Sequence, residues 1–363
     1  MVLSDRVLMG PGPSNLYPEV ISAFTRPLLG HLDPEFLEVL DETCDRLRAV
    51  YRTTNSLTLP VSGTGSGGME AAFVNLVGEG DVVVVGVNGL FGERMCEVAS
   101  RLGADVVRVD APWGEPLDPA AVIGAHPSPA VIALVHAETS TGVRNDVEAV
   151  ARGKGDALLI VDAVTSLGGI PFDADRWGVD FAYSGTQKCL GVPPGLSPVT
   201  VGPRARLALK PRPSSWYFDL GLIARYVEGA GGRTYHHTAP VSMVFALHAG
   251  LGVLLEESLE GAWARHRACG EALQEGLEKL GFALVAPPGH RLPQLTTVWV
   301  PDELGGMGEA DVRAALLHRY GIEIGAGVGV MAGRAWRIGC MGHTARPRNV
   351  ELLLGALGEV LGR

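Results

Sequence analysis

Lysine, basic clusters and long apolar runs are all scarce in this chain. Four of its 30 Lys and Arg residues are lysines, and its net charge at pH 7 is -10. An acidic chain without a basic run is a poor match for a polyanion, so we expect no nucleic-acid partner. The apolar runs are far shorter than the roughly 20 residues that cross a bilayer. No signal-peptide core opens the sequence, and we expect no membrane segment.

Cysteine is sparse as well. The five cysteines are odd in number, scattered and without the spacing of metal ligands: Cys44, Cys96, Cys189, Cys269 and Cys340. We therefore predict reduced thiols, a cytoplasmic location and no metal site. The pattern GxxxxGK[ST] is absent, which excludes a nucleoside-triphosphate site of that type. With 47% hydrophobic and 19% charged residues in 363, the chain is long and apolar enough for two globular domains.

One of the lysines has unusual surroundings. Lys188 lies in the segment 182–195 among small, hydroxylated and apolar residues, whereas Lys154, Lys210 and Lys279 have ordinary polar neighbours. Most such lysines pack their stem at the edge of a core. A nucleophilic amine must be partly desolvated so that its pKa falls towards neutrality. Only Lys188 meets this condition, so any Schiff base in this protein is expected there.

Strands and helices alternate through the first half of the chain. We predict strands over 57–61, 81–87, 105–109, 130–135, 157–161 and 180–184, and helices over 18–25, 35–51, 69–76, 91–102 and 146–153. Several of these strands are continuously apolar, which predicts a mostly parallel sheet covered by helices on both faces. Beyond residue 201 we expect a long helix over 241–274. A smaller α/β region follows, with strands near 282–285, 295–300 and 336–338 and helices over 309–320 and 347–361.

The chemically interesting residues follow the carboxyl ends of the predicted strands. They are Ser62–Gly68, Asn88–Phe91, His136–Thr141, Asp162 and Ser184–Lys188. Parallel sheets bind ligands at that edge, so these segments are expected to converge on one site.

Individually, each of these segments has more than one interpretation. The glycines of Ser62–Gly68, placed before a helix, make a phosphate site or only a tight turn, and Gly63-x-Gly65 could also mimic a dinucleotide fingerprint. Asp162 needs either a helix N-terminus or a cationic ligand atom such as a pyridinium nitrogen. Phe91 could cover that ring or belong to the core. Thr139 could donate to the ring's phenolic oxygen or cap a strand end.

Taken together, the sequence resembles the class V, fold-type I aminotransferases that use pyridoxal 5′-phosphate (PLP), in particular the alanine–glyoxylate and serine–glyoxylate (serine–pyruvate) group. The matching segments run in collinear order along nearly the whole chain: Gly10–Asn15, Gly30-His31, Ser62–Gly65, Met69–Ala71, Gly86–Gly89, Ser140–Val143, Val161–Gly169, Tyr183–Lys188, Pro193–Ser197, Tyr235–Thr238 and Arg337–Gly339.

The resemblance implies a role for each matching position. Lys188 would hold PLP and move the proton of the substrate carbon, and Asp162 would pair with the pyridine nitrogen. Phe91 would stack on the ring where many relatives have Trp, and Thr139 would lie near the ring oxygen. Arg337 would bind the substrate carboxylate, with Gly12 and His31 near the substrate. The phosphate contacts would be Gly65, Ser66, Gly67 and Gln187, joined by Tyr235 and Thr238 of a neighbouring subunit. Ser66 departs from the histidine of some alanine–glyoxylate members.

The same resemblance implies the architecture and the partners. We expect an α/β protein whose large domain has a mostly parallel, seven-stranded type of sheet between helices. The expected units are an N-terminal arm over 1–20 at a dimer interface, a PLP-binding domain over 21–255 and a small C-terminal α/β domain over 256–363. A homodimer with shared active sites is expected.

The expected reaction is ping-pong transfer of an amino group from alanine or serine to glyoxylate or another small 2-oxo acid. Three alternatives stay open. The first is another class V activity, either ureidoglycine–glyoxylate transamination or a cysteine desulfurase or lyase reaction, for which Cys340 is near Arg337. The second is a nicotinamide-dependent dehydrogenase that uses Gly63–Gly68, and the third is a non-catalytic binding protein.

Overall fold

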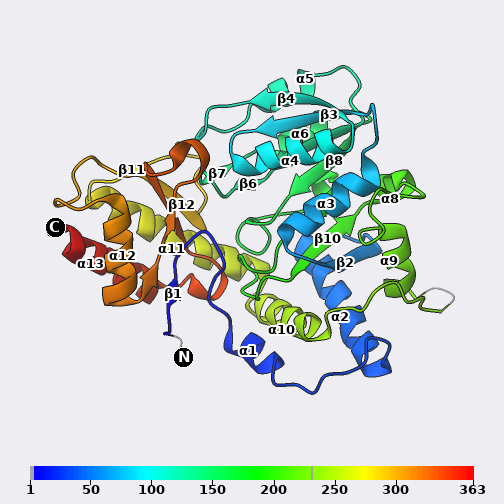
Figure 1. Cartoon of the computed structure of the whole chain (residues 1–363), viewed down its shortest axis with the longest axis horizontal. Coiled ribbons are helices and arrows are strands. Elements are labelled where there is room, and N and C mark those ends of the chain that lie inside the picture. The colour runs from blue at the N-terminus through cyan, green and yellow to red at the C-terminus, as the bar shows by residue number, and fades with distance from the viewer. Residues whose placement is uncertain (1–3, 230–231) are drawn as a thin grey trace.

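The computed structural model describes residues 4–229 and 232–363 (Figure 1). It has two parts, and a seven-stranded sheet lies at the centre of the larger one. In spatial order its strands are β2 (Leu57–Ser62), β10 (Leu196–Val201), β9 (Phe181–Tyr183), β8 (Leu158–Asp162), β5 (Val131–Val135), β3 (Val82–Val87) and β4 (Asp105–Asp110). β10 runs antiparallel to both of its neighbours, and the other pairs are parallel. The predicted α/β fold with a mostly parallel sheet is confirmed.

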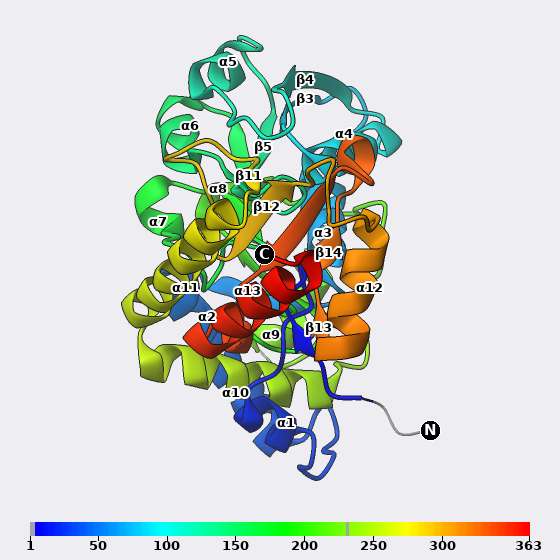
Figure 2. The same ribbon diagram turned by 90° about the vertical axis from the view of Figure 1, so that its left-hand side faces the viewer.

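Helices cover both faces of this sheet (Figure 2). They include α2 (Pro34–Tyr51), α3 (Gly65–Leu76), α4 (Leu90–Arg101), α5 (Pro119–Gly124), α6 (Val147–Gly153), α7 (Ala174–Trp177), α8 (Pro203–Ala208) and α9 (Leu220–Val227). The short hairpin β6 (Ala137–Glu138) and β7 (Val143–Arg144) leaves the sheet after β5. Most of the sheet strands are buried because apolar residues occupy both of their faces, whereas the edge strand β4 is partly exposed.

Strand β10 was missing from the sequence prediction because proline is unusual inside a sheet. Pro198 cannot donate a backbone hydrogen bond, although its carbonyl accepts one from the Ser184 N–H at 2.8 Å. The Ser184 carbonyl instead accepts from the Ser197 hydroxyl at 2.6 Å. A side chain thus replaces the missing donor just before the segment that carries Lys188.

Two predicted helix boundaries were wrong. Helix α3 begins at Gly65 and not at Met69, so the glycines of the predicted loop form its first turn. The sequence did not reveal this start because glycine has a low helix propensity, a preference that tertiary packing can override. The predicted helix over 241–274 is two helices, α10 (Val241–Glu257) and α11 (Leu259–Lys279), which meet at 85°. Ser258 between them has φ 71°, a left-handed conformation that no helix can continue through.

The C-terminal part has its own sheet and its own apolar cluster. The antiparallel order is β11 (Ala283–Leu284), β12 (Leu295–Trp299), β15 (Ala335–Gly339) and β14 (Gly325–Ala326), packed with α11, α12 (Glu309–Tyr320) and α13 (Pro347–Leu361). The buried residues of this cluster are Met9 and residues from Cys269 to Leu361, whereas the main cluster ends at Trp263. The exact division into domains stays a prediction.

The N-terminal segment crosses between these two parts. Strand β1 (Val7–Leu8) pairs in parallel with β13 (Ile322–Glu323), and Met9 is fully buried in the C-terminal cluster. After α1 (Pro18–Ala23) the chain enters the larger part, as the blue trace in Figure 1 shows. In the described residues no single helix is long and apolar enough to span a membrane; α10 and α11 pass that test only as a bent pair.

Candidate active site

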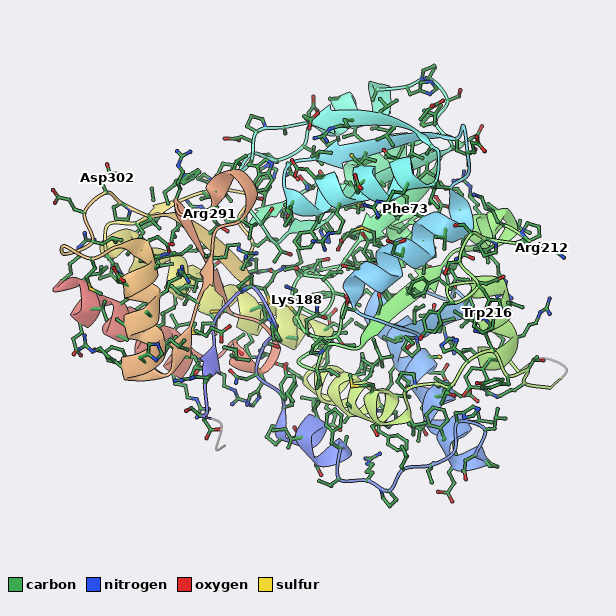
Figure 3. All side chains as sticks on the ribbon, in the orientation of Figure 1. Phe73, Lys188, Arg212, Trp216, Arg291 and Asp302 are labelled. Atoms are coloured by element: carbon green, nitrogen blue, oxygen red, sulfur yellow. The ribbon has the colours of Figure 1, made fainter. Side chains whose placement is uncertain are left out.

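The predicted nucleophile, Lys188, is buried beneath the N-terminal segment. It follows β9 in a turn, is 8% exposed, and its Nζ donates to the Pro11 carbonyl. Ser14 holds the crossing segment in place, because its hydroxyl donates to the Lys188 carbonyl at 2.9 Å and its N–H donates to the Gln187 carbonyl at 2.9 Å. Figure 3 labels Lys188 where this segment passes between the two parts of the chain.

Gly12 is required for this close approach. Its φ is 104°, and a Cβ there would come within 2.6 Å of Lys188 Cδ and 2.7 Å of Lys188 Nζ. A larger residue would therefore displace the lysine side chain. The structure puts Gly12 directly beside the predicted nucleophile.

Burial changes the proton affinity of Lys188. Desolvation, with a further contribution from the positive charge of Arg337, lowers the pKa of Lys188 to about 8. An amine with this pKa is partly uncharged near neutrality, which is the state in which it can attack a carbonyl carbon.

The predicted ring partner, Asp162, is the last residue of β8 and is 2% exposed. Its Oδ1 accepts from the Val164 N–H at 2.8 Å, and its Oδ2 accepts from the Tyr183 hydroxyl at 3.0 Å. Burial raises the pKa of Asp162 to about 7, against the opposing effect of these hydrogen bonds. In the described part of the chain no cation lies within ion-pair distance of this carboxylate, so a cationic ligand atom would stabilise its charged form.

The predicted phosphate contacts open α3. Thr64, the residue that precedes this helix, provides no side-chain cap. The N–H groups of Gly65 and Ser66 have no acceptor among the described hydrogen bonds. A Cβ at Gly65 would lie 2.7 Å from Val164 Cγ2, which makes glycine necessary where α3 meets the loop after β8. Gly67 lies in the same first turn. Uncapped N–H groups at a helix start favour an anion.

Phe91 is the second residue of α4 and is partly buried. The Arg94 guanidinium lies 4.9 Å from the centre of its ring, and Arg94 Nη1 donates to the Ser66 hydroxyl at 3.1 Å. The predicted ring-stacking residue and the predicted phosphate contact are thus bridged by one arginine.

Thr139 contacts the loop that follows β8, and Gln187 is the neighbour of Lys188 in the chain. The Thr139 hydroxyl is buried and hydrogen-bonded to the Thr165 hydroxyl. Gln187 precedes Lys188, and its buried Oε1 has no hydrogen-bond partner within the described residues.

Arg337 comes from β15 in the C-terminal sheet. Its Nε donates to the Ala326 carbonyl at 2.8 Å, and burial lowers the pKa of the guanidinium while the charge of Glu138 opposes that shift. No carboxylate lies within ion-pair distance of Arg337 in residues 4–229 and 232–363. The guanidinium can therefore take a carboxylate from outside the chain.

The remaining predicted residues lie apart from Lys188 in this single chain. Tyr235 is 54% exposed, its hydroxyl lies 3.3 Å from the Thr238 hydroxyl, and its ring centre lies 5.0 Å from that of His31. The carbonyl of His31 accepts from the Tyr226 hydroxyl. His31 therefore contacts Tyr235, and nothing among the described contacts joins it to Lys188.

Comparison with known proteins agrees with this geometry. The sequence description of the family "Aminotransferase class-V" matches residues 12–346. The chain belongs to this family.

Its relatives are similar over their whole length. The aminotransferase is 40% identical to an alanine–glyoxylate aminotransferase of Oryctolagus cuniculus, over 98% of this chain and 92% of that protein. Among solved structures, an alanine–glyoxylate aminotransferase from Nostoc sp. has a TM-score of 0.94 at 44% identity and covers 99% of this chain and 96% of its own. A ureidoglycine–glyoxylate aminotransferase from Bacillus subtilis has a TM-score of 0.96 at 36% identity, covering 100% and 94%.

Two residues of the aminotransferase site escaped the sequence analysis. Arg94 lies three positions after Phe91 and so on the same face of α4, a spacing that could have identified it. Glu138 was included in the segment His136–Thr141 but was given no role, since nothing in the sequence shows that its carboxylate is fully buried.

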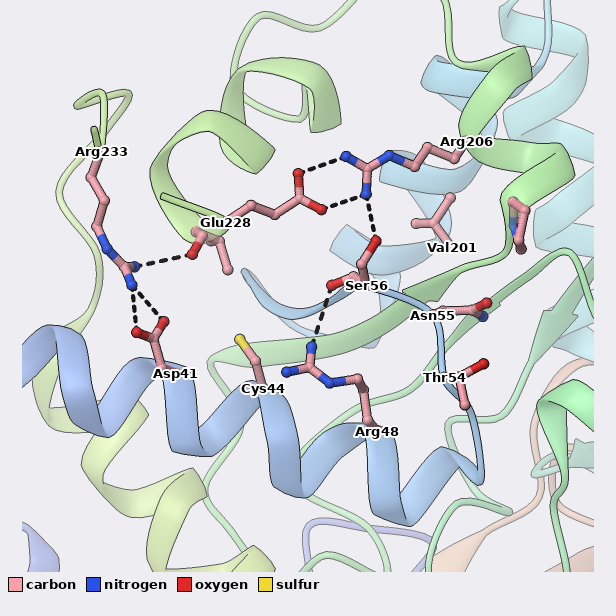
Figure 4. A pocket seen from close by; sticks show the side chains of 12 residues that line it. Asp41, Cys44, Arg48, Thr54, Asn55, Ser56, Val201, Arg206, Glu228 and Arg233 are labelled. Carbon is pink, nitrogen blue, oxygen red and sulfur yellow. Dashed lines mark hydrogen bonds and ion pairs between the residues drawn. The ribbon is translucent and has the colours of Figure 1, made fainter. Parts of the chain in front are cut away.

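Another cavity of the aminotransferase is lined by residues other than Lys188, Asp162 and Arg337. It measures about 880 Å³ and lies between α2, α8 and α9, with three arginines in its lining (Figure 4). Each arginine already has a carboxylate partner: Arg206 binds Glu228, Arg233 binds Asp41, and Arg48 binds Asp45. Its charges are thus neutralised within the chain. No group of three or more metal-ligating side chains occurs among the described residues.

Proposed function

We propose that this aminotransferase uses PLP to transfer an amino group from a small amino acid, alanine or serine, to glyoxylate or another small 2-oxo acid in a ping-pong reaction. The observation that carries the proposal is the buried Lys188, which lies beside Gly12. Burial, together with the positive charge of Arg337, lowers the pKa of this lysine. Similarity to alanine–glyoxylate aminotransferases at 40% and 44% identity supports the choice of substrates.

The residues present fit PLP. Lys188 would hold the aldehyde carbon, the unpaired carboxylate of Asp162 would face the pyridine nitrogen, and the uncapped start of α3 would bind the phosphate. The buried Oε1 of Gln187, which has no hydrogen-bond partner within the described residues, supports a polar ligand group on this side of the lysine. When bound, PLP supplies an electron sink that stabilises negative charge at the substrate Cα.

The protein's own residues would perform the remaining tasks. Arg337 would fix the substrate carboxylate and so orient the Cα–H bond. Lys188 Nζ, uncharged in part near neutrality, would accept the Cα proton and return it during the second half-reaction. Asp162 would keep a proton on the ring nitrogen. The N-terminal segment around Gly12 would exclude water and leave space for small side chains only.

The proposal includes a homodimer in which Tyr235 and Thr238 serve the partner's phosphate site. Tyr235 is exposed, and its neighbours in the chain, His236 and His237, pack against the exposed Trp216 and Tyr217. Large exposed apolar side chains of this kind are typical of protein interfaces. We also propose a cytoplasmic location, which the five buried, unpaired cysteines support.

A second candidate is ureidoglycine–glyoxylate transamination. It is favoured by the TM-score of 0.96 and by the 36% identity to the (S)-ureidoglycine–glyoxylate transaminase of Bacillus subtilis. A desulfurase has no comparable support, because Cys340 is fully buried and burial raises the pKa of its thiol.

The test is a panel of amino donors with glyoxylate as acceptor. The purified protein, loaded with PLP, is incubated with L-alanine, L-serine or (S)-ureidoglycine, and glycine formation is measured. We expect glycine from alanine or serine and none with the Lys188→Ala variant. Faster transfer from ureidoglycine would favour the second candidate. Failure with every donor, by a protein that shows no visible absorbance after PLP loading, would refute the proposed function.

A further inference from the structure

Glu138, at the end of β6, is a fully buried carboxylate to which the proposed function gives no role. Its Oε1 accepts from the N–H and the hydroxyl of Ser140, at 3.0 and 2.6 Å. Its Oε2 accepts from the N–H of Phe91 at 3.3 Å. All three partners are donors, so the group is bound as an acceptor, which suits an ionised carboxylate.

These contacts cap α4 from outside the helix. Gly89 is the residue before α4 and has no side chain to cap it. The Ser140 hydroxyl accepts from the Leu90 N–H at 3.0 Å, and Glu138 accepts from the next N–H, that of Phe91. A task that a local Ser, Thr, Asp or Asn usually performs is thus performed by two residues about 50 positions further along the chain.

Gly89 has the space for this arrangement because it lacks a Cβ. A Cβ there would lie 2.4 Å from both Cγ and Cδ of Glu138 and from the Ser140 hydroxyl. Its φ of 173° is ordinary extended backbone, so the requirement for glycine comes from the carboxylate and not from the backbone conformation. The Glu138 side chain can therefore occupy its position only because residue 89 is glycine.

The same carboxylate connects two proposed ring contacts. The Phe91 N–H donates to this carboxylate directly, and Thr139 follows Glu138 in the chain. A second link lies close by, where the side-chain amides of Asn88 and Asn145 donate to each other at 2.9 and 3.1 Å. The start of α4 is thus tied at two points to the segment around the β6–β7 hairpin.

We propose that Glu138 is a positioning residue that sets the place of Phe91 relative to Thr139, so that the two side chains form a preorganised slot for the cofactor ring. This inference rests on the proposed function, because it assumes that PLP binds between them. A rigid supporting contact improves affinity because the site does not have to be ordered on binding.

The experiment distinguishes helix capping from positioning by replacing the distant cap of α4 at Glu138 with a local one at position 89. Glu138→Ala removes the carboxylate. Adding Gly89→Asp and Ser140→Ala to the same chain supplies a local carboxylate, for which the loss of the Glu138 side chain and of the Ser140 hydroxyl makes room. The melting temperature of the PLP-free protein reports the cap, and the dissociation constant for PLP, from its visible absorbance, reports the slot. Glu138→Gln provides a milder variant in case Glu138→Ala does not fold.

We expect Glu138→Ala to lower the melting temperature and to weaken PLP binding roughly tenfold, as for supporting residues of other bound groups. The combined variant with Gly89→Asp and Ser140→Ala should recover the melting temperature and not the affinity. Recovery of both would show that Glu138 only caps α4 and would overturn the proposal. Unchanged affinity in Glu138→Ala or Glu138→Gln would overturn it too.

Asp146→Ala is the matched control. Asp146 caps α6, its Oδ1 accepts from the Ala149 N–H at 2.9 Å, and it is exposed. Its loss should lower the melting temperature without changing PLP affinity. If the wild-type protein itself shows no PLP band, the proposed function fails instead, while the melting temperatures still report on the cap.

Discussion

The chain contains two charged clusters that differ in how their charges are balanced. In the large cavity of Figure 4, every lining arginine has a carboxylate partner, for example Arg206 Nη2 with Glu228 Oε2 at 2.6 Å and Arg233 Nη2 with Asp41 Oδ1 at 2.6 Å. Around Lys188, the side chains of Lys188 and Asp162 are buried and that of Arg337 is partly buried, and no ion pair within the described residues joins any of them.

Whether its charges are paired distinguishes a structural cluster from a reactive one better than the size of a cavity does. Charges that are paired inside the chain leave nothing for a ligand to neutralise, and exposed pairs add little to stability. Buried charges without partners destabilise the empty protein and are compensated when a ligand of opposite charge binds. This contrast supports our proposal that the Lys188 cluster is the functional one.

The largest effect is expected from Asp162→Asn, which removes the carboxylate and keeps its shape. The ring nitrogen of PLP would lose its charged partner, and transamination should fall about a hundredfold, the equivalent of one strong hydrogen bond to a charged group. Steady-state kinetics with alanine and glyoxylate measure this. Unchanged turnover would mean that Asp162 is as structural as the carboxylates of the large cavity.

Arg337→Met should raise KM for the amino donor roughly tenfold or more by removing a charged hydrogen-bond donor. It should also raise the pKa of Lys188, because the Arg337 charge lowers that pKa. Since the uncharged amine is the form that reacts, the rate of PLP uptake should shift to higher pH. Arg334→Met, at an exposed neighbouring position, is the control. An equal shift in both variants would contradict a specific role for Arg337.

Lys188→Met should stabilise the PLP-free protein. With a pKa lowered to about 8 in the folded state, against 10.5 as the ordinary value, Lys188 makes folding less favourable below pH 8. The wild-type free energy of unfolding should therefore rise between pH 8 and 10.5, and the variant should lose this rise. The difference near neutrality is about 3 kcal/mol. Urea titrations at several pH values measure it, and equal pH dependence would show that Lys188 is well solvated.

The smallest effect is expected from Arg206→Met in the large cavity. It breaks a paired, partly exposed contact with Glu228, so the loss of unfolding free energy should be about 0.5–1 kcal/mol. Transamination should be unchanged, which a melting curve and the same activity assay check together. A large loss of activity would mean that the balanced cluster also serves function.

The fold class could be predicted because apolar strands alternate with helices over a long stretch, and the observed β3, β5 and β8 lie within a residue of their predicted bounds. The antiparallel β10 could not be predicted, because Pro198 argues against a strand and only the neighbouring Ser197 hydroxyl makes it tolerable. The break at Ser258 was equally invisible, since the residues on both sides favour a helix.

By itself, the sequence pointed to the lysine and the aspartate through their local surroundings, and to the arginine through its resemblance to a family whose motifs occur in the same order. The tertiary structure decided what surrounds them. Burial of Asp162, the approach of Gly12 to Lys188 and the capping of α4 by Glu138 all join residues far apart in the chain. Proton affinity and preorganisation depend on desolvation and on such distant contacts, and these exist only once the chain has folded.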